Sequence, residues 1–184
     1  DNRLHATYYV VAHFHLVMGV AAIFGMFAAT YFWFPKMFGR MMSEPLGKIH
    51  FWLTFIGAYL IFMPMHWLGI AGGIRRYADY TAVDFLKPLQ PVHNFITYAA
   101  FATAAAQIFF LANFFWSLKH GAKASKNPWD GTTLEWDTDS PPPLDNFGGN
   151  YPSVYRGPYE FSVPGVEPDF IPQNIEPQNV PRKK

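Results

Sequence analysis

The chain has 184 residues, of which 51% are hydrophobic and 19% aromatic, and its formal net charge is +1. So small a charge, carried by scattered basic residues, gives no field that would favour nucleic acid as a partner. The absence of cysteine excludes disulfides, thiolate zinc sites, iron–sulfur clusters and c-type haem attachment on this chain, which leaves histidine as the strong ligand for a soft metal.

Composition divides the chain into two parts. Residues 1–118 hold long apolar runs and few charges, whereas residues 119–184 hold 11 of the 16 prolines and most of the acidic residues. The sequence begins at Asp1 without a basic and apolar leader. We therefore expect it to be a piece of a longer protein or one product of a split gene.

Three stretches are apolar and long enough to cross a bilayer, which takes roughly 20 helical residues. They are residues 7–34, 49–71 and 93–118, and none has Asp, Glu, Lys or Arg in its interior. Aromatic residues gather near their ends, where amphipathic rings suit the membrane interface. The sequence therefore predicts an all-α membrane protein with three transmembrane helices over residues 1–118.

Small residues recur every four positions on two of these stretches, as Ala21, Gly25 and Ala29 and as Ala102 and Ala106. Stripes of this kind allow close contact between helices in lipid. Alanine is also simply a good helix former, which explains the pattern equally well.

The basic residues near the helix ends indicate an orientation. Six lie on one side of the predicted bundle and four, diluted by acids, on the other. The positive-inside tendency then places the N-terminus outside and residues 119–184 in the cytoplasm or matrix. The six are Lys36, Arg40, Lys48, Lys119, Lys123 and Lys126, and the four are Arg3, Arg75, Arg76 and Lys87.

The tail, residues 119–184, loses helical periodicity and fills with Pro, Asp, Gly and Asn. Proline removes a backbone donor and fixes φ, which favours extended, solvated backbone. Its Trp and Tyr residues argue against complete disorder. We expect an irregular path along a partner surface.

Two histidines, His13 and His15, lie inside the first predicted span with Phe14 between them. A helix turns 100° per residue, so the two imidazoles project about 200° apart and suit two different groups better than one shared metal. Polar residues within a span are costly and suggest function, and haem iron takes an imidazole as axial ligand. Periodicity alone leaves a second interpretation open, in which each histidine packs against a neighbour and bonds a carbonyl.

The run LHATYYVVAHFH at residues 4–15 resembles the tenth-helix signature of subunit I of the haem-copper terminal oxidases, the cytochrome c oxidase family. Similar motifs follow in the same order across about 120 residues, and the tail resembles the ends of bacterial and some mitochondrial members. They are WFP at 33–35, GKIHF at 47–51, PMHWLG at 64–69, RRYADY at 75–80, LEW at 134–136 and SPPP at 140–143.

The resemblance implies that the chain is the C-terminal portion of a twelve-helix subunit and carries its last three helices. His13 would be the ligand of the high-spin haem that faces copper, and His15 one of two axial ligands of the low-spin haem. Phe14 would lie between the two haems, which are expected to be a-type. The copper ligands would all lie outside this chain.

Four further positions match the haem surroundings in the family. Arg75 and Arg76 match an arginine pair at the propionates, where a guanidinium fork suits carboxylates. Asp1 and His5 match positions near the propionates of the high-spin haem. The family has an aspartate after the histidine equivalent to His5, and the pair helps bind magnesium or manganese. Ala6 stands there in this chain, so a metal at His5 and a hydrogen bond from His5 to a propionate or water both stay open.

The function that the resemblance implies is transfer of electrons from cytochrome c to oxygen, with water as product and with proton pumping. The preceding portion of subunit I, subunits II and III, cytochrome c and membrane lipids are the expected partners, in a bacterial plasma membrane rather than a mitochondrial inner membrane. A quinol-oxidising relative, a di-haem electron-transfer cytochrome and a non-catalytic membrane scaffold fragment are the alternatives.

Overall fold

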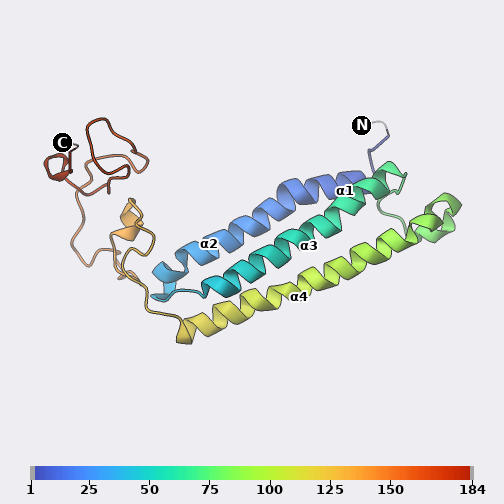
Figure 1. The fold of residues 1–184 in the computed structure, drawn as a ribbon, viewed down its shortest axis with the longest axis horizontal. Helices are drawn as coiled ribbons and strands as arrows, with labels where there is room; N and C mark the ends of the chain where they lie inside the picture. Colours follow the sequence, from blue (N-terminus) through green and yellow to red (C-terminus); the bar gives the residue numbers. More distant parts are fainter. Residues whose placement is uncertain (1–2, 183–184) are drawn as a thin grey trace. The chain divides into compact units, whose positions relative to one another are not determined.

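The computed structural model of the chain describes residues 3–182, and its long elements are helices. Helix α1 spans Tyr8–Phe14 and continues through a π-helical turn, His15–Val20, into α2, Ala21–Phe38. Helix α3 spans Glu44–Ile70 and α4 spans Gln90–His120 (Figure 1). Residues 3–182 contain isolated β-bridges but no β-strand, so the predicted all-α class is confirmed.

Three helical segments are long and apolar enough to cross a membrane, as the sequence predicts. They are Tyr8–Phe38, Glu44–Ile70 and Asp84–His120. The first segment continues beyond Phe34 because Pro35 removes only one backbone donor, and the helix ends before Gly39, whose φ is +65°.

The chain is made of two compact units, and each combines segments that are distant in sequence. The first unit holds residues up to Thr30 together with Ser43–Trp116, and the second holds Tyr31–Met42 together with Ser117–Lys184. The first unit therefore contains most of the length of the helices, and the second contains the end of α2 and the tail.

Close approach of α1 and α3 in the first unit depends on one glycine. A Cβ added to Gly69 would overlap the backbone nitrogen of Tyr9, so no other residue fits without a shift. Gly57 likewise allows α3 to approach α4 closely, because a Cβ added there would overlap Oγ1 of Thr103. Small residues of this kind let apolar helices pack closely in lipid.

Buried polar groups join α3 to α4. Oε1 of Gln107 lies 2.9 Å from Nε2 of His50, and Nε2 of Gln107 donates to Oγ1 of Thr54 at 3.0 Å. Near the start of α3, the Asn113 amide exchanges two 2.9 Å hydrogen bonds with the backbone of Ser43. Polar atoms cost least within a span when they are paired in this way.

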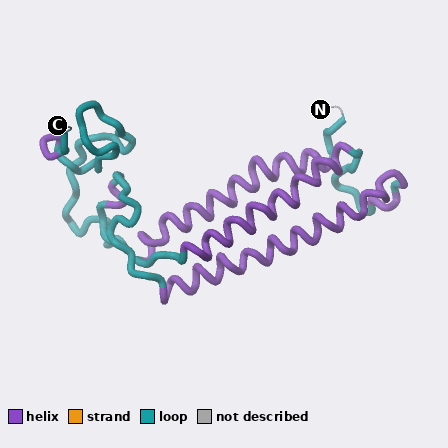
Figure 2. Tube along the Cα trace, viewed as in Figure 1, coloured by secondary structure: helices purple, strands orange, loops and turns teal. Residues whose placement is uncertain are grey.

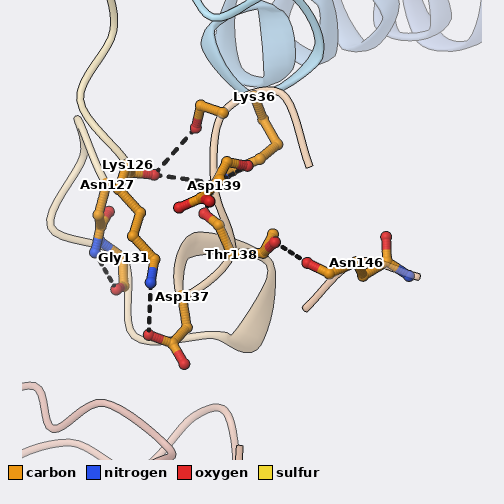
Figure 3. A network of polar contacts seen from close by, with 9 residues as sticks. Lys36, Lys126, Asn127, Gly131, Asp137, Thr138, Asp139 and Asn146 are labelled. Carbon is orange, nitrogen blue, oxygen red and sulfur yellow. Dashed lines mark hydrogen bonds and ion pairs between the residues drawn. The ribbon is translucent and has the colours of Figure 1, made fainter. Parts of the chain in front are cut away.

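Lys36 organises the second unit (Figure 3). Its side chain is 6% exposed, and its ammonium group donates to the carbonyls of Thr138 at 2.7 Å and Lys126 at 3.0 Å, with Asp139 at 3.4 Å. The Trp136 ring lies 5.2 Å from Nζ, within reach of a cation–π interaction. A buried ammonium needs such partners to offset its lost hydration.

The tail is mostly loop, as Figure 2 shows, but it folds back on itself. Backbone amides of Tyr155, Ser162 and Glu167 donate to carbonyls further along the chain at 2.8–2.9 Å. Its 3₁₀ turns are Leu134–Trp136 and Pro177–Asn179. The irregular path follows from the high proline content, since proline cannot complete a ladder of backbone hydrogen bonds.

Candidate functional site

The predicted ligand helix, α1, is capped by Thr7. The Thr7 hydroxyl accepts a 3.2 Å hydrogen bond from the amide of Tyr9, which satisfies one of the free donors of the first turn. Ala12, which is fully buried, marks the side of α1 that packs in the unit. This packing fixes how the next three side chains project.

His13 and His15 have different surroundings. His13 is exposed, and no hydrogen bond or ring contact is found for it within residues 3–182. His15 is half-buried, and its Nδ1 lies 2.8 Å from the carbonyl oxygen of Val11. Because a carbonyl can only accept, this contact places the proton on Nδ1 and leaves the Nε2 lone pair free to bind a metal.

Two aromatic rings contact the His15 imidazole. The Phe62 ring of α3 is stacked on it, with centroids 5.1 Å apart and planes 16° apart. The ring of Phe14 lies 4.3 Å away at 33° and is itself 39% exposed. The Phe14 side chain thus lies beside the His15 imidazole and, like His13, is exposed at the surface of the helix.

A π-helical turn begins at His15 and ends at Val20. Turns of this kind are rare within α-helices and are frequent at functional sites. The backbone amide of His15 donates to the carbonyls of both Val11 and Ala12, and the regular α-helical hydrogen-bond pattern ends at this point. The helix is therefore locally widened next to a predicted ligand.

Backbone hydrogen bonds bring two of the predicted loop sites together. The amide of Arg75 donates to the carbonyl of Ala6 at 2.9 Å, and Tyr8 donates to Gly73 at 2.9 Å. His5 and Arg76 are exposed and Arg75 is half-buried, so their side chains can reach a ligand that is carried elsewhere. Asp1 lies outside the described residues.

The loop after α3 also holds a stabilised carboxylate. Asp79 accepts hydrogen bonds from the Thr81 hydroxyl at 2.6 Å and the Thr81 amide at 2.8 Å. These two donors hold the pKa of the Asp79 carboxyl below its ordinary value. Asp79 is exposed, and with its pKa lowered it stays ionised at neutral pH.

Sequence reasoning misses the residues that contact His15. The Val11 carbonyl lies one helical turn before His15. Such a carbonyl normally accepts a bond from a backbone amide, and the valine side chain gives no sign that it also contacts a histidine. Phe62 is one of 19 phenylalanines in the chain. Nδ1 of His66 lies 2.9 Å from the carbonyl oxygen of Phe62.

No three His, Asp or Glu side chains come together as a metal site within the described part of the chain. His13 and His15 each stand as a single imidazole, and haem needs only one or two such ligands from the protein. The free Nε2 of His15 and the exposed ring of His13 therefore fit axial ligation of haem iron.

Residues 1–125 match the family described as Cytochrome C and Quinol oxidase polypeptide I. The alternative cytochrome c oxidase subunit 1 of Bradyrhizobium diazoefficiens is 50% identical over 96% of this chain and 30% of its own length. Cytochrome c oxidase subunit 1 of Synechocystis is 50% identical over 89% of this chain and 28% of its own length.

A third relative, cytochrome c oxidase subunit 1 of Cereibacter sphaeroides, is 46% identical over 80% of this chain and 26% of its own length. The chain thus spans less than a third of the length of these relatives. Since the family match covers residues 1–125, more than half of the chain, the chain belongs to the cytochrome c and quinol oxidase polypeptide I family.

Proposed function

We propose that this chain is part of the catalytic subunit of a respiratory terminal oxidase that passes electrons from cytochrome c to oxygen, forms water and pumps protons. The observation that carries the proposal is the pair His13 and His15 on a helix of a family member, one imidazole exposed and the other held by Val11 with its Nε2 free.

In this proposal His15 is one of two axial ligands of a low-spin haem, and His13 is the ligand of a high-spin haem. When bound, two a-type haems and copper supply the electron transfer and the oxygen reduction. His15 contributes a fixed tautomer, because the Val11 carbonyl keeps the proton on Nδ1. Phe14, whose ring lies 4.3 Å from that of His15, would lie between the two haems.

Arg75 and Arg76 bind haem propionates in the proposal, and His5 and Asp1 lie near them. The backbone bond between Arg75 and Ala6 supports this grouping of the two loops. A guanidinium is a permanent cation with a fixed fork of donors, which suits a carboxylate. The proposal includes no magnesium or manganese ion at His5, because Ala6 offers no carboxylate oxygen as a ligand.

The other ligands belong to the preceding portion of subunit I. The second axial histidine and the copper ligands come from there, and subunits II and III complete the assembly. The three apolar segments cross a bacterial plasma membrane, with the tail on the cytoplasmic side, as the excess of basic residues there supports.

The test is a pair of difference spectra, reduced minus oxidised and with carbon monoxide, recorded on the purified complex that contains this chain. His15→Ala is expected to abolish the low-spin band, and His13→Ala the carbon monoxide-reactive signal. His120→Ala, an exposed histidine at the end of α4, serves as the matched control and leaves both signals intact. Unchanged spectra in the first two variants would reject the proposal.

Quinol is the second candidate donor, because the matched family includes quinol oxidases by its description. The three relatives above carry the name cytochrome c oxidase, which supports cytochrome c as the donor. Oxidation of reduced cytochrome c by the purified complex, with a soluble quinol as the competing donor, separates the two.

A further inference from the structure

The stack between Phe62 and His15 is the contact that ties the predicted ligand to a second helix. His15 lies at the end of α1 and Phe62 in α3, and their ring planes differ by only 16°. A second ring on the imidazole belongs to Phe14, which precedes His15 on the same helix. The Phe62 contact therefore relates the imidazole plane to a surface outside its own helix.

One hydrogen bond alone does not fix an imidazole plane. The 2.8 Å bond from Nδ1 to the Val11 carbonyl anchors one atom of the ring. Rotation about the bond between Cβ and the ring has broad wells, so the plane still has freedom to swing. A flat ring stacked on the imidazole removes that freedom, because tilting would break the face-to-face contact.

The backbone of α3 at Phe62 is linked to α1 through His66. The carbonyl oxygen of Phe62 lies 2.9 Å from Nδ1 of His66, whose ring meets the Tyr9 ring edge to face at 4.8 Å. Gly69 lets the Tyr9 backbone approach α3 closely. The contacts thus run from Tyr9 through His66 and Phe62 to His15, and both ends of this path lie on one continuous helical segment.

We propose that Phe62 is a positioning residue that sets the plane of the His15 imidazole. The inference rests on the proposed role of His15 as an axial ligand. Residues around a ligating histidine fix its orientation and tune its metal, and axial-ligand surroundings are among the protein's controls over a haem. Phe62 acts through His15 and does not itself ligate.

The experiment compares three variants of the purified complex. Phe62→Leu keeps an apolar side chain but removes the flat ring, and Phe62→Tyr keeps the ring. Phe55→Leu is the matched control, because Phe55 lies on the same helix and stacks at the same 16° angle, 5.7 Å between centroids, on Phe51 instead of a histidine.

The readouts are the electron paramagnetic resonance spectrum of the oxidised low-spin haem and its midpoint potential. Phe62→Leu is expected to shift and broaden the highest g feature and to move the potential, with the carbon monoxide-reactive signal unchanged. Phe62→Tyr and Phe55→Leu are expected to match the unmodified complex. Phe62→Met, with a flexible side chain, gives a second variant in which the same shift is expected.

Failure of this inference is distinguishable from failure of the proposed function. If His15→Ala loses the low-spin signal while Phe62→Leu or Phe62→Met, whichever assembles, gives the spectrum and potential of Phe55→Leu, the positioning role is wrong and the ligand role stands. If His15→Ala retains the low-spin signal, the ligand role fails and the inference falls with it.

Discussion

Ala6 occupies a backbone conformation that alanine rarely adopts. Its φ is 58°, in the left-handed region, and it lies between His5 and the capping residue Thr7. That conformation costs an L-residue roughly 1–2 kcal/mol, and glycine avoids this cost. A glycine also gives the unfolded chain more conformational entropy, which offsets part of the gain. Ala6→Gly is therefore expected to stabilise the protein by up to about 1 kcal/mol.

The measurement is the midpoint of thermal unfolding of the assembled protein. Ala12→Gly is the control, because Ala12 is fully buried in α1 and glycine there loses helix propensity and packing. Its midpoint should fall while that of Ala6→Gly rises. A lower midpoint for Ala6→Gly would mean that the Ala6 methyl group makes contacts that outweigh the backbone strain.

At this scale the sequence indicates the proposed ligands better than it indicates the residues that contact them. His13 and His15 stand out because a polar side chain within an apolar span is costly. Val11 contacts His15 through a backbone carbonyl, a group that every residue carries, and the Phe62 contact depends on how α3 packs against the first helical segment. The absence of a carboxylate at Ala6 is visible in the sequence, but its left-handed backbone is not.

At the scale of secondary-structure elements, the close contact between α1 and α3 depends on Gly69. Gly69→Ala would place a methyl group on top of the Tyr9 nitrogen, so the two helices must separate. Overpacking of this kind costs typically about 1–3 kcal/mol. We expect a lower unfolding midpoint and a weakened His15 site, since Tyr9 and His15 lie on the same helical segment.

Gly25→Ala is the matched control for that substitution. Gly25 also lies within a helix, α2, but a Cβ added there meets nothing within 4 Å. Alanine at this position is expected to be neutral or slightly stabilising through its higher helix propensity. Equal unfolding midpoints for the two variants would show that α1 and α3 can separate without loss.

The predicted stripe of small residues illustrates why contacts between elements escape sequence patterns. Ala21 and Gly25 have the spacing of a packing face, yet both are exposed within this chain, whereas Ala106 of the other stripe is buried. The close contacts occur at Gly57 and Gly69, which no stripe marks. Spacing predicts which residues share a helix face, but the neighbour of that face depends on the fold.

The bridge between α3 and α4 yields a second test at this scale. Gln107→Leu removes a hydrogen-bond partner of His50 and the Gln107 donor to Thr54, and both of these residues are buried. Interhelical hydrogen bonds in membranes contribute on average about 0.6 kcal/mol to stability. The buried polar atoms that bonded Gln107 lose that partner in the variant, which adds to the loss of stability. We expect destabilisation of about 1–2 kcal/mol, measured as a lower unfolding midpoint.

Gln90→Leu is the control for the bridge. The Gln90 amide lies at the start of α4 and donates to Asn94 of the same helix at 2.7 Å on an exposed surface. Its replacement should change the midpoint little, because water can replace that bond. If Gln107→Leu is equally mild, the hydrogen bonds to His50 and Thr54 do not hold the two helices together.

For the whole molecule, the sequence predicts the three apolar spans but not the grouping of the chain into compact units. Composition changes at about residue 118, whereas the second unit also takes in Tyr31–Met42. One reason is Lys36, which lies near the end of an apolar helix and donates to carbonyls of the tail. The sequence shows Lys36 as one of several basic residues at helix ends, and its partners lie too far along the chain for a local pattern to identify.

Lys36→Met tests whether that contact holds the tail together. The substitution keeps a linear apolar side chain but leaves the carbonyls of Lys126 and Thr138 without the ammonium donor. Hydrogen bonds to a charged group contribute roughly 1.5–3 kcal/mol each, and the loss of a buried charge offsets part of this, so we expect a net loss of about 2 kcal/mol. The opened fraction of the second unit would then rise roughly 30-fold.

Chymotrypsin, which cuts at exposed aromatic residues, reports that opening in membranes carrying the assembled protein. Cleavage near Trp136, which is 3% exposed, should be accelerated in proportion to the opened fraction, because the cleavage rate follows the open population when opening is fast. Lys48→Met is the control, since Lys48 is exposed and pairs across one helical turn with Glu44 at 2.7 Å. Equal cleavage rates in the two variants would mean that the aromatic contacts of Trp136, with Phe32 at 5.0 Å, hold the tail without help from the buried ammonium.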